Sequence, residues 1–496
     1  MAGHRVTWAK RAVLVVGLVL GVLAVIQLER ARIGVERVGF AAGTTPATLY
    51  QTAGDGPVVV IAHGFAGSRQ LMEAFSLTLA RAGYRVAAFD FEGHGRNPVP
   101  MSGDVNAIEG TTARLVAETQ RVVEAAREMT GYAGPVALLG HSMASDVVVR
   151  TALSEGDVAA VVAVSMFSQA VTAEEPDGLL AISGQWEPQL RGFALEAVGE
   201  VQAGAVEGET VTNGTVTRRA VVAPFVEHVG VLYSPVSLRE TRDWLAERLP
   251  VRAPEAPVAT IGPWISLLMV ATVLLTWPLA GLLGPRQAPV AAVPRGMFWA
   301  VLAVPVVVAP AVATQVQLDL LPVMVADTLA VMLAIYGALQ LIALRALGIR
   351  FGPLDWRAVA LLLGWGLLVF GLALDRYAAS FVPIPDRLPI IAALAVGTLP
   401  FMLADALITQ GGQAALWRRV AARVAVFVAL GIAVWLDPER LFFLVIIFPV
   451  LILFFVVHGL MGRWVGQHGG ALAAGLGLGL ILAWALGVSF PMFDAV

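Results

Sequence analysis

The chain has 496 residues, of which 58% are hydrophobic and only 14% are charged. Soluble domains carry about 25% charged residues, so this composition excludes a purely soluble protein and predicts extensive burial in lipid. The chain has no cysteine, which excludes disulfide bonds and thiolate metal sites. Its net charge of −3 comes from an acidic excess in residues 36–252, so its charge does not favour nucleic-acid binding.

The first element is an uncharged apolar run at residues 12–28, preceded by Arg5, Lys10 and Arg11. A cleaved signal peptide would show the same order of basic and apolar residues, but it also needs small residues at a cleavage site. The sequence that follows, QLERARIG, offers no good site of this kind. Residues 1–35 are therefore predicted to be an N-terminal transmembrane anchor with a juxtamembrane segment.

In residues 36–252, short β-branched runs alternate with amphipathic stretches. This alternation predicts βαβ units and a mainly parallel sheet flanked by helices. The expected strands are GPVVVIAHG, RVAAFDF, PVALLG, VAAVVAVS, LLAIS and RRAVVAPFV. The expected helices are SRQLMEAFSLTLARAGY, a helix near residues 111–130, a helix from Met143, and PVSLRETRDWLAERL.

A Pro-rich stretch at residues 253–263 reads as a linker. Residues 264–496 then predict a transmembrane domain of about eight helices, each near the roughly 20 residues that a bilayer helix needs. The anchor brings the number of spans to nine. The expected spans of the domain are 264–284, 297–316, 320–344, 358–376, 388–408, 418–436, 441–461 and 470–488.

The loops between these spans predict the orientation. If the N-terminus is cytoplasmic, the cytoplasmic loops hold nine arginines and the opposite short loops hold three, Arg376, Arg387 and Arg440. This split agrees with the positive-inside rule and with the basic N-terminus. Residues 36–252 then lie outside the cytoplasm. An Ala-, Arg- and Gly-rich chain with one lysine suggests a GC-rich bacterial genome. In a Gram-negative source the protein is expected in the inner membrane, with this domain on the periplasmic side.

The segment Gly140-His141-Ser142-Met143-Ala144 differs by one residue from G-x-S-x-G, the nucleophile elbow of serine hydrolases. The elbow needs small residues two positions before and after the serine, and alanine is small. An apolar strand leads into the segment and a helical stretch leads out, as an elbow requires. A chance match in a Gly-rich chain is the alternative interpretation.

Two further segments extend the pattern, and together they resemble the α/β-hydrolase family over about residues 36–252. AHGFAGS (62–68) is similar to the family's oxyanion turn, which implies an oxyanion hole from the amides of Phe65 and Met143. FDFEGHGRN (89–97) matches the family's Asp-x-x-Gly-x-Gly turn, and His94 is expected to be structural there.

The resemblance also implies a catalytic triad in the order Ser, acid, His. His228 is the only histidine between Ser142 and the membrane spans, while His458 and His468 are placed at the last cytoplasmic loop. The acid should follow the preceding strand, where Glu187 occupies the position of the usual Asp. Three other acidic residues precede that strand: Glu174, Glu175 and Asp177. They are therefore expected at the edge of the sheet opposite to Ser142 and His228.

These features predict an integral-membrane serine hydrolase that cleaves a lipid or another acyl ester or thioester through an acyl-enzyme. No cofactor and no metal are expected, and the expected partners are the substrate and membrane lipids. The segment 166–178 is too short for a helical cap, so the catalytic mouth is hypothesised to face the bilayer. Two alternatives stay open: a transporter or scaffold with a non-catalytic binding module, and an acyltransferase using the same triad.

Two stretches of the membrane half, LPVMVADTLA (321–330) and LPFMLADALI (399–408), echo each other and indicate a parallel duplication. Their aspartates, Asp327 and Asp405, are candidates for an intramembrane polar site because buried carboxylates are costly in lipid. The expected spans place Asp327 a third of the way in from outside and Asp405 near the cytoplasmic end, which argues against one shared site. In the alternative interpretation, the aspartates have no functional role: each lies near a helix end or forms a hydrogen bond to a neighbouring helix.

Overall fold

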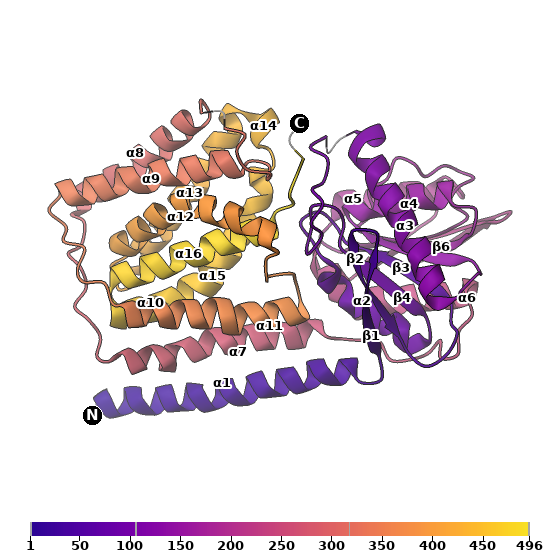
Figure 1. Ribbon diagram of the computed structural model, residues 1–496, viewed down its shortest axis with the longest axis horizontal. Coiled ribbons are helices and arrows are strands. Elements are labelled where there is room, and N and C mark those ends of the chain that lie inside the picture. The colour runs from indigo at the N-terminus through magenta and orange to yellow at the C-terminus, as the bar shows by residue number, and fades with distance from the viewer. Residues whose placement is uncertain (1, 105–106, 317, 495–496) are drawn as a thin grey trace. The chain divides into compact units, whose positions relative to one another are not determined.

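The computed structural model describes residues 2–104, 107–316 and 318–494 (Figure 1). The chain forms two compact units. The α/β unit comprises Ala24–Ser266, Asp375–Ser380 and the residues from Pro491 onward. The helical unit comprises the residues up to Leu23, Leu267–Leu374 and Phe381–Phe490.

The α/β unit is built on a nine-stranded sheet with the order β1-β2-β4-β3-β5-β6-β7-β9-β8. The six strands from β4 to β9 in this order are parallel, and antiparallel strands lie at both edges. The strands are β1 (Glu36–Ala42), β2 (Thr45–Gln51), β3 (Val58–Ala62), β4 (Arg85–Phe89), β5 (Val136–His141), β6 (Val158–Val164), β7 (Gly178–Gly184), β8 (Thr210–Asn213) and β9 (Val216–Ala223).

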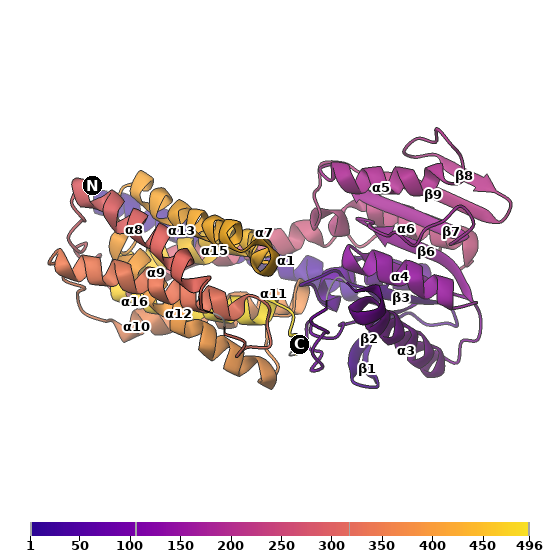
Figure 2. The same cartoon turned by 90° about the horizontal axis from the view of Figure 1, so that it is seen from above.

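The predicted fold class, a mainly parallel sheet flanked by helices, is confirmed. Every residue of β3, β4, β5 and β7 is buried, as expected for a parallel sheet covered on both faces. Helix α3 packs beside α4 (Figure 2), and α2 packs beside α6. The helices are α2 (Glu73–Ala82), α3 (Ala113–Thr130), α4 (Met143–Ser154), α5 (Pro188–Gly199) and α6 (Pro235–Arg248).

The sequence did not predict the edge strands β1, β2 and β8 or the helix α5. The missed strands are less completely buried than the central strands, as the alternation of buried and partly buried positions in β2 shows, and short stretches of this kind are hard to separate from loops. Helix α5 begins at a proline directly after Glu187, and its apolar pattern is weak.

In the described residues, nine helical segments are long and apolar enough to cross a membrane, the number that the sequence predicts. They include α1 (Ala2–Arg32), α7 (Gly262–Ala280), α8 (Arg295–Ala313), α9 (Ala326–Ala346), the segment Trp356–Tyr377 that contains α10 (Trp356–Leu363) and α11 (Phe370–Tyr377), α12 (Leu388–Ile408), α13 (Leu416–Leu436), α15 (Leu444–Gly469) and α16 (Ala471–Ser489).

Small residues allow the central helices of the helical unit to approach closely. A Cβ at Gly337 of α9 would overlap the backbone of Pro400 and Phe401 in α12. Glycines of α16, Gly475 and Gly479, lie directly against the backbone of α12. Small-residue stripes of this kind pack apolar helices together, and α9, α12 and α16 form the core of this unit (Figure 1).

Two helix boundaries differ from the sequence analysis. Helix α15 continues to Gly469 and ends where Gly470 adopts a φ of 88°. His458 and His468 therefore lie inside the helix, and their placement in a loop was wrong. Helix α9 begins at Ala326 and not near residue 320, because Val325 has a φ of 59° that interrupts the helix. The first six residues of the expected span are therefore not helical.

Candidate active site

Ser142 lies at the turn between β5 and α4. Its backbone has a φ of 53° and a ψ of −119°, a conformation that is uncommon for a residue other than glycine and that turns the chain sharply. A Cβ at Gly140 would overlap the carbonyl oxygen of Ala144, so the first small position requires glycine. The methyl group of Ala144 is fully buried within this turn. Alanine at the second small position is therefore compatible with an elbow.

The structure brings Ser142, His228 and Glu187 together. The His228 Nε2 atom lies 2.8 Å from the Ser142 hydroxyl, and its Nδ1 atom lies 2.6 Å from Glu187 Oε1. Ser142, Glu187 and His228 follow the carboxyl ends of β5, β7 and β9, which meet at one edge because these strands are parallel. The His228 side chain is 44% exposed, whereas that of Glu187 is 5% exposed.

The second oxygen of Glu187 is held by two donors. The backbone N–H of Gly184 donates to Oε2 at 2.6 Å, and the Ser165 hydroxyl donates to it at 2.9 Å. Burial raises the pKa of Glu187, but the hydrogen bonds from His228, Gly184 and Ser165 outweigh burial and leave that pKa below its usual range. Glu187 is thus a carboxylate at neutral pH, and it orients the imidazole through Nδ1–H.

His141 is a functional candidate that sequence reasoning missed, although it occupies the first variable position of the elbow. Its ring is buried and its centroid lies 4.8 Å from that of His228. The His141 Nε2–H donates to the carbonyl oxygen of His228 at 2.8 Å. Burial, together with the neighbouring His228, lowers the pKa of His141 to about 3, so the ring is neutral and positions the His228 backbone.

The segment 62–68 passes directly beside the nucleophile. A Cβ at Gly64 would lie 3.0 Å from the Cβ of Ser142, so glycine lets this turn approach, and Phe65 is the next residue. The His63 ring fixes the turn, because Nδ1–H donates to the Gly64 carbonyl at 2.8 Å and Nε2 accepts the Phe91 N–H at 3.1 Å. An oxyanion hole from the Phe65 and Met143 amides stays a prediction.

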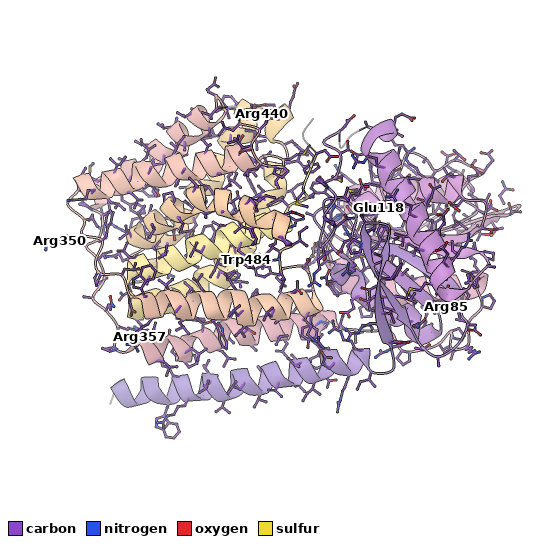
Figure 3. All side chains as sticks on the ribbon, in the orientation of Figure 1. Arg85, Glu118, Arg350, Arg357, Arg440 and Trp484 are labelled. Carbon is purple, nitrogen blue, oxygen red and sulfur yellow. The ribbon has the colours of Figure 1, made fainter. Side chains whose placement is uncertain are left out.

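The segment 89–97 is held by buried carboxylates and contributes no group to the triad. The His94 Nδ1 atom contacts the Glu92 carbonyl at 2.8 Å. Glu118, labelled in Figure 3, accepts hydrogen bonds from Asn97 and from the backbone N–H of Glu92 at 2.9 Å each. Burial raises the pKa of Glu118 to about 7. Its role in this turn carried no sequence signal because Glu118 lies on α3, more than 20 residues away.

The two aspartates of the helical unit occupy different environments. Asp327 lies in the first turn of α9, where its carboxylate accepts the backbone N–H groups of Leu320 and Leu321 at 3.2 and 3.0 Å. Its expected position well inside a span is therefore wrong. Asp405 is buried in the last turn of α12, with Arg423 at 3.9 Å. They share no bonding partner among the described residues.

No group of three or more His, Asp or Glu side chains in the described ranges is arranged to hold a metal ion. The catalytic edge presents a hydroxyl, an imidazole and a carboxylate, which can act as a nucleophile, a base and a group that orients the base.

Comparisons with known proteins identify related sequences and structures. A family model described as "Serine aminopeptidase, S33" matches residues 56–195. A dienelactone hydrolase from Anabaena variabilis aligns with 44% of this chain and 99% of its own, at 16% identity and a TM-score of 0.32. A predicted CIB-like hydrolase from Thermoplasma acidophilum aligns with 43% of this chain and 98% of its own, at 16% identity and a TM-score of 0.34. No curated protein matches the chain.

The His141→Gln variant is expected to lose less unfolding free energy than the wild type when the pH is lowered. In the unfolded chain a histidine takes up its proton near pH 6.5, whereas the pKa of folded His141 is about 3. Between these values the unfolded state binds more protons, so the unfolding free energy falls as the pH falls. Between pH 7.5 and 5.0 this group alone should account for about 2 kcal/mol.

The measurement is denaturant unfolding of the purified full-length protein, followed through the α/β unit at both pH values. Between pH 7.5 and 5.0, the unfolding free energy of the wild type should fall by about 2 kcal/mol more than that of His141→Gln. Equal losses in the two proteins would contradict a buried, neutral imidazole at this position.

Proposed function

The α/β unit is an α/β hydrolase of the serine type, and from this premise we propose that the protein is an integral-membrane enzyme that cleaves acyl esters at Ser142. The observation that carries the proposal is the continuous hydrogen-bond chain from Ser142 through His228 to Glu187. Such a chain combines an activated hydroxyl, a base and an orienting carboxylate in the arrangement that acyl transfer requires.

The proposed reaction has two steps. The Ser142 Oγ attacks the ester carbonyl while His228 Nε2 takes its proton, and the amides of Phe65 and Met143 stabilise the oxyanion. When the ester C–O bond breaks, His228 returns the proton to the leaving alcohol and an acyl-Ser142 ester remains. Water then attacks this ester with His228 as base, which releases the carboxylic acid and restores the hydroxyl. Glu187 remains ionised and stabilises the imidazolium.

We propose that the acyl group is apolar, as in a lipid ester or thioester. Large apolar side chains are exposed on loops at the catalytic edge: Phe167 after β6, Trp186 after β7 and Phe225 after β9, with 50, 61 and 76% of their areas exposed. The loop between β6 and β7 is described throughout and contains no helix, so no cap covers these side chains. Exposed apolar surface of this kind marks an interaction site for apolar ligands or membranes.

We also propose that the nine apolar helices span a bacterial inner membrane with the α/β unit on the extracytoplasmic side. Support comes from the length and composition of the helices and from the arginine-rich loops that the positive-inside rule places in the cytoplasm. In this arrangement the enzyme is confined to the surface where lipid esters are concentrated.

The triad is tested with a fluorophosphonate probe on the purified full-length protein. Wild type should be labelled, Ser142→Ala should not, and Glu187→Gln should react about 10³–10⁴-fold more slowly because the imidazole loses its orienting anion. Ser154→Ala, at the far end of α4, is the matched control and should be labelled like wild type. A folded wild-type protein that resists the probe would favour a non-catalytic binding module.

The substrate class is tested with p-nitrophenyl esters of increasing acyl length. If the exposed aromatic side chains contact the acyl chain, kcat/KM should rise up to about fourfold per methylene group buried. The double variant Trp186→Ser/Phe225→Ser should flatten this rise, whereas Leu153→Ser, exposed at the far end of α4, should not. Faster cleavage of aminoacyl p-nitroanilides than of any ester would contradict an acyl-ester substrate and indicate a peptidase.

The topology is tested with single cysteines, since the chain has none of its own. In intact cells, a membrane-impermeant maleimide should label Ala203→Cys in the α/β unit. Arg350→Cys, in the loop after α9, should be labelled only after the cells are permeabilised. The reverse pattern would show that the α/β unit is cytoplasmic.

A further inference from the structure

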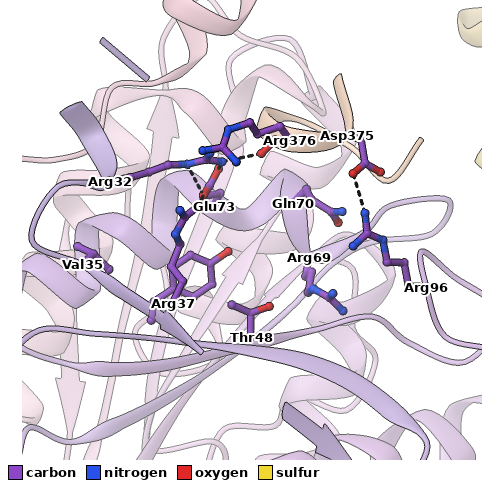
Figure 4. Close-up of a pocket in the computed structure, with 11 residues that line it drawn as sticks. Arg32, Val35, Arg37, Thr48, Arg69, Gln70, Glu73, Arg96, Asp375 and Arg376 are labelled. Carbon is purple, nitrogen blue, oxygen red and sulfur yellow. Dashed lines mark hydrogen bonds and ion pairs between the residues drawn. The ribbon is translucent and has the colours of Figure 1, made fainter. Parts of the chain in front are cut away.

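A second site lies within the α/β unit, in a cavity of about 470 Å³ that contains none of the triad residues (Figure 4). Its polar lining comes from the end of α1, the strands β1 and β2, the segments that follow β3 and β4, the first residue of α2 and the last turn of α11. Five of the lining residues are arginines: Arg32, Arg37, Arg69, Arg96 and Arg376.

Four of these arginines have a carboxylate partner. Arg32 pairs with Glu73 and Arg96 pairs with Asp375, both at 2.6 Å (Figure 4). Arg69 pairs with Asp90 at 2.9 Å and Arg376 pairs with Glu29 at 2.8 Å. A guanidinium carries five N–H donors, so each of these groups keeps donors that its carboxylate does not use.

Arg37 is the cation in excess. Its nearest carboxylate oxygen belongs to Glu73 at 3.7 Å, and that carboxylate already accepts two hydrogen bonds from Arg32. Within the described ranges the Arg37 guanidinium makes no hydrogen bond, and its side chain is 34% exposed. The cavity therefore presents one positive charge without a matching negative one.

Neutral polar groups around Arg37 are also unused. The Gln70 side chain makes no hydrogen bond among the described residues: its amide N–H groups are free to donate, and its amide oxygen, an acceptor, is buried without a partner. The hydroxyls of Tyr50 and Thr48 line the same cavity without a hydrogen-bond partner in the described chain. The Gln70 oxygen is buried, and buried polar groups are nearly always satisfied. The two hydroxyls and the Gln70 N–H groups are unused donors beside an uncompensated guanidinium, so the cavity has the donors to hold an anionic ligand.

We propose that this cavity binds a phosphate group, carried by an anionic phospholipid or free in solution. A phosphate offers several acceptor oxygens and a negative charge, which match the guanidinium, amide and hydroxyl donors. The position of two lining residues favours a lipid: Arg32 is the last residue of α1, and Arg376 lies in the last turn of α11. Basic side chains at the ends of membrane spans lie at the level of lipid head groups.

The experiment measures binding to detergent-solubilised full-length Ser142→Ala protein by isothermal titration calorimetry. This background removes turnover, so a failure to bind leaves the proposed hydrolase intact, and a failure of the hydrolase leaves this site intact. The titrants are dioctanoyl phosphatidylglycerol, inorganic phosphate, and dioctanoylglycerol, which has the same acyl chains without the phosphate.

Dioctanoyl phosphatidylglycerol or phosphate should bind, and Arg37→Gln should raise its Kd at least about tenfold because a charge-assisted hydrogen bond is lost. Gln70→Leu should weaken binding as well, which keeps the test valid if one variant folds poorly. Arg30→Gln is the matched control: it removes an exposed arginine from the same end of α1, outside the cavity, and should bind like the parent.

Binding of phosphatidylglycerol without binding of phosphate would identify a lipid head-group site, and equal binding of both would identify a site for the free ion. The proposal is overturned if neither titrant binds, if Arg37→Gln binds as Arg30→Gln does, or if dioctanoylglycerol binds with the same sensitivity to Arg37→Gln.

Discussion

The hydrogen bond between Glu187 and His228 is the interaction on which the candidate site depends. Burial raises the pKa of Glu187 and so favours the protonated carboxyl, which accepts the imidazole Nδ1–H less strongly than a carboxylate does. The hydrogen bonds from His228, Gly184 and Ser165 outweigh burial and leave a carboxylate. The fixed carboxylate then directs Nε2 toward Ser142. The sheet supplies the rest of the geometry, because parallel strands bring all three loops to one edge.

Close packing surrounds the backbone of the nucleophile, Ser142. The backbone of Ser142 has a positive φ between β5 and α4, and a side chain at Gly140 or Gly64 would meet neighbouring atoms at this turn. Ala144 is accommodated with its methyl group fully buried. The sequence differs from the G-x-S-x-G pattern at Ala144, but the structure meets the steric requirements of the nucleophile elbow.

Much of the α/β fold and of the triad could be predicted from the sequence, because these features follow local rules. Buried parallel strands read as apolar runs, the elbow is a contiguous motif, and Glu187 and His228 each follow a recognisable strand. His141 and Ser165 were missed because their roles come from what they contact across the sheet. The boundary before Asp327 was missed because it depends on one residue, Val325, with a positive φ.

The cavity beside Arg37 had no sequence signal for the same physical reason. Its ion pairs join residues such as Arg96 and Asp375, which are 279 positions apart, and isolated arginines along the chain carry no periodicity. Long-range charge pairs are set by the tertiary fold, whereas motifs and hydrophobic periods are set by local backbone geometry. A site formed by contiguous turns can therefore be predicted from one sequence. A site formed by charged residues that are far apart in the sequence cannot.

The choice of glutamate over the family's usual aspartate has a structural reason. Glu187 lies at the start of α5, and its side chain folds back over the chain so that Oε2 reaches the backbone N–H of Gly184. A Cβ at Gly184 would lie 2.6 Å from the Val226 carbonyl oxygen and 3.0 Å from Glu187 Oε2, so glycine makes room for both the neighbouring backbone and the carboxylate. An aspartate on this backbone would stop about 1.5 Å short, and it would give up either Gly184 or His228. The extra methylene group therefore allows one carboxylate to be anchored by the strand end and to hold the imidazole at the same time.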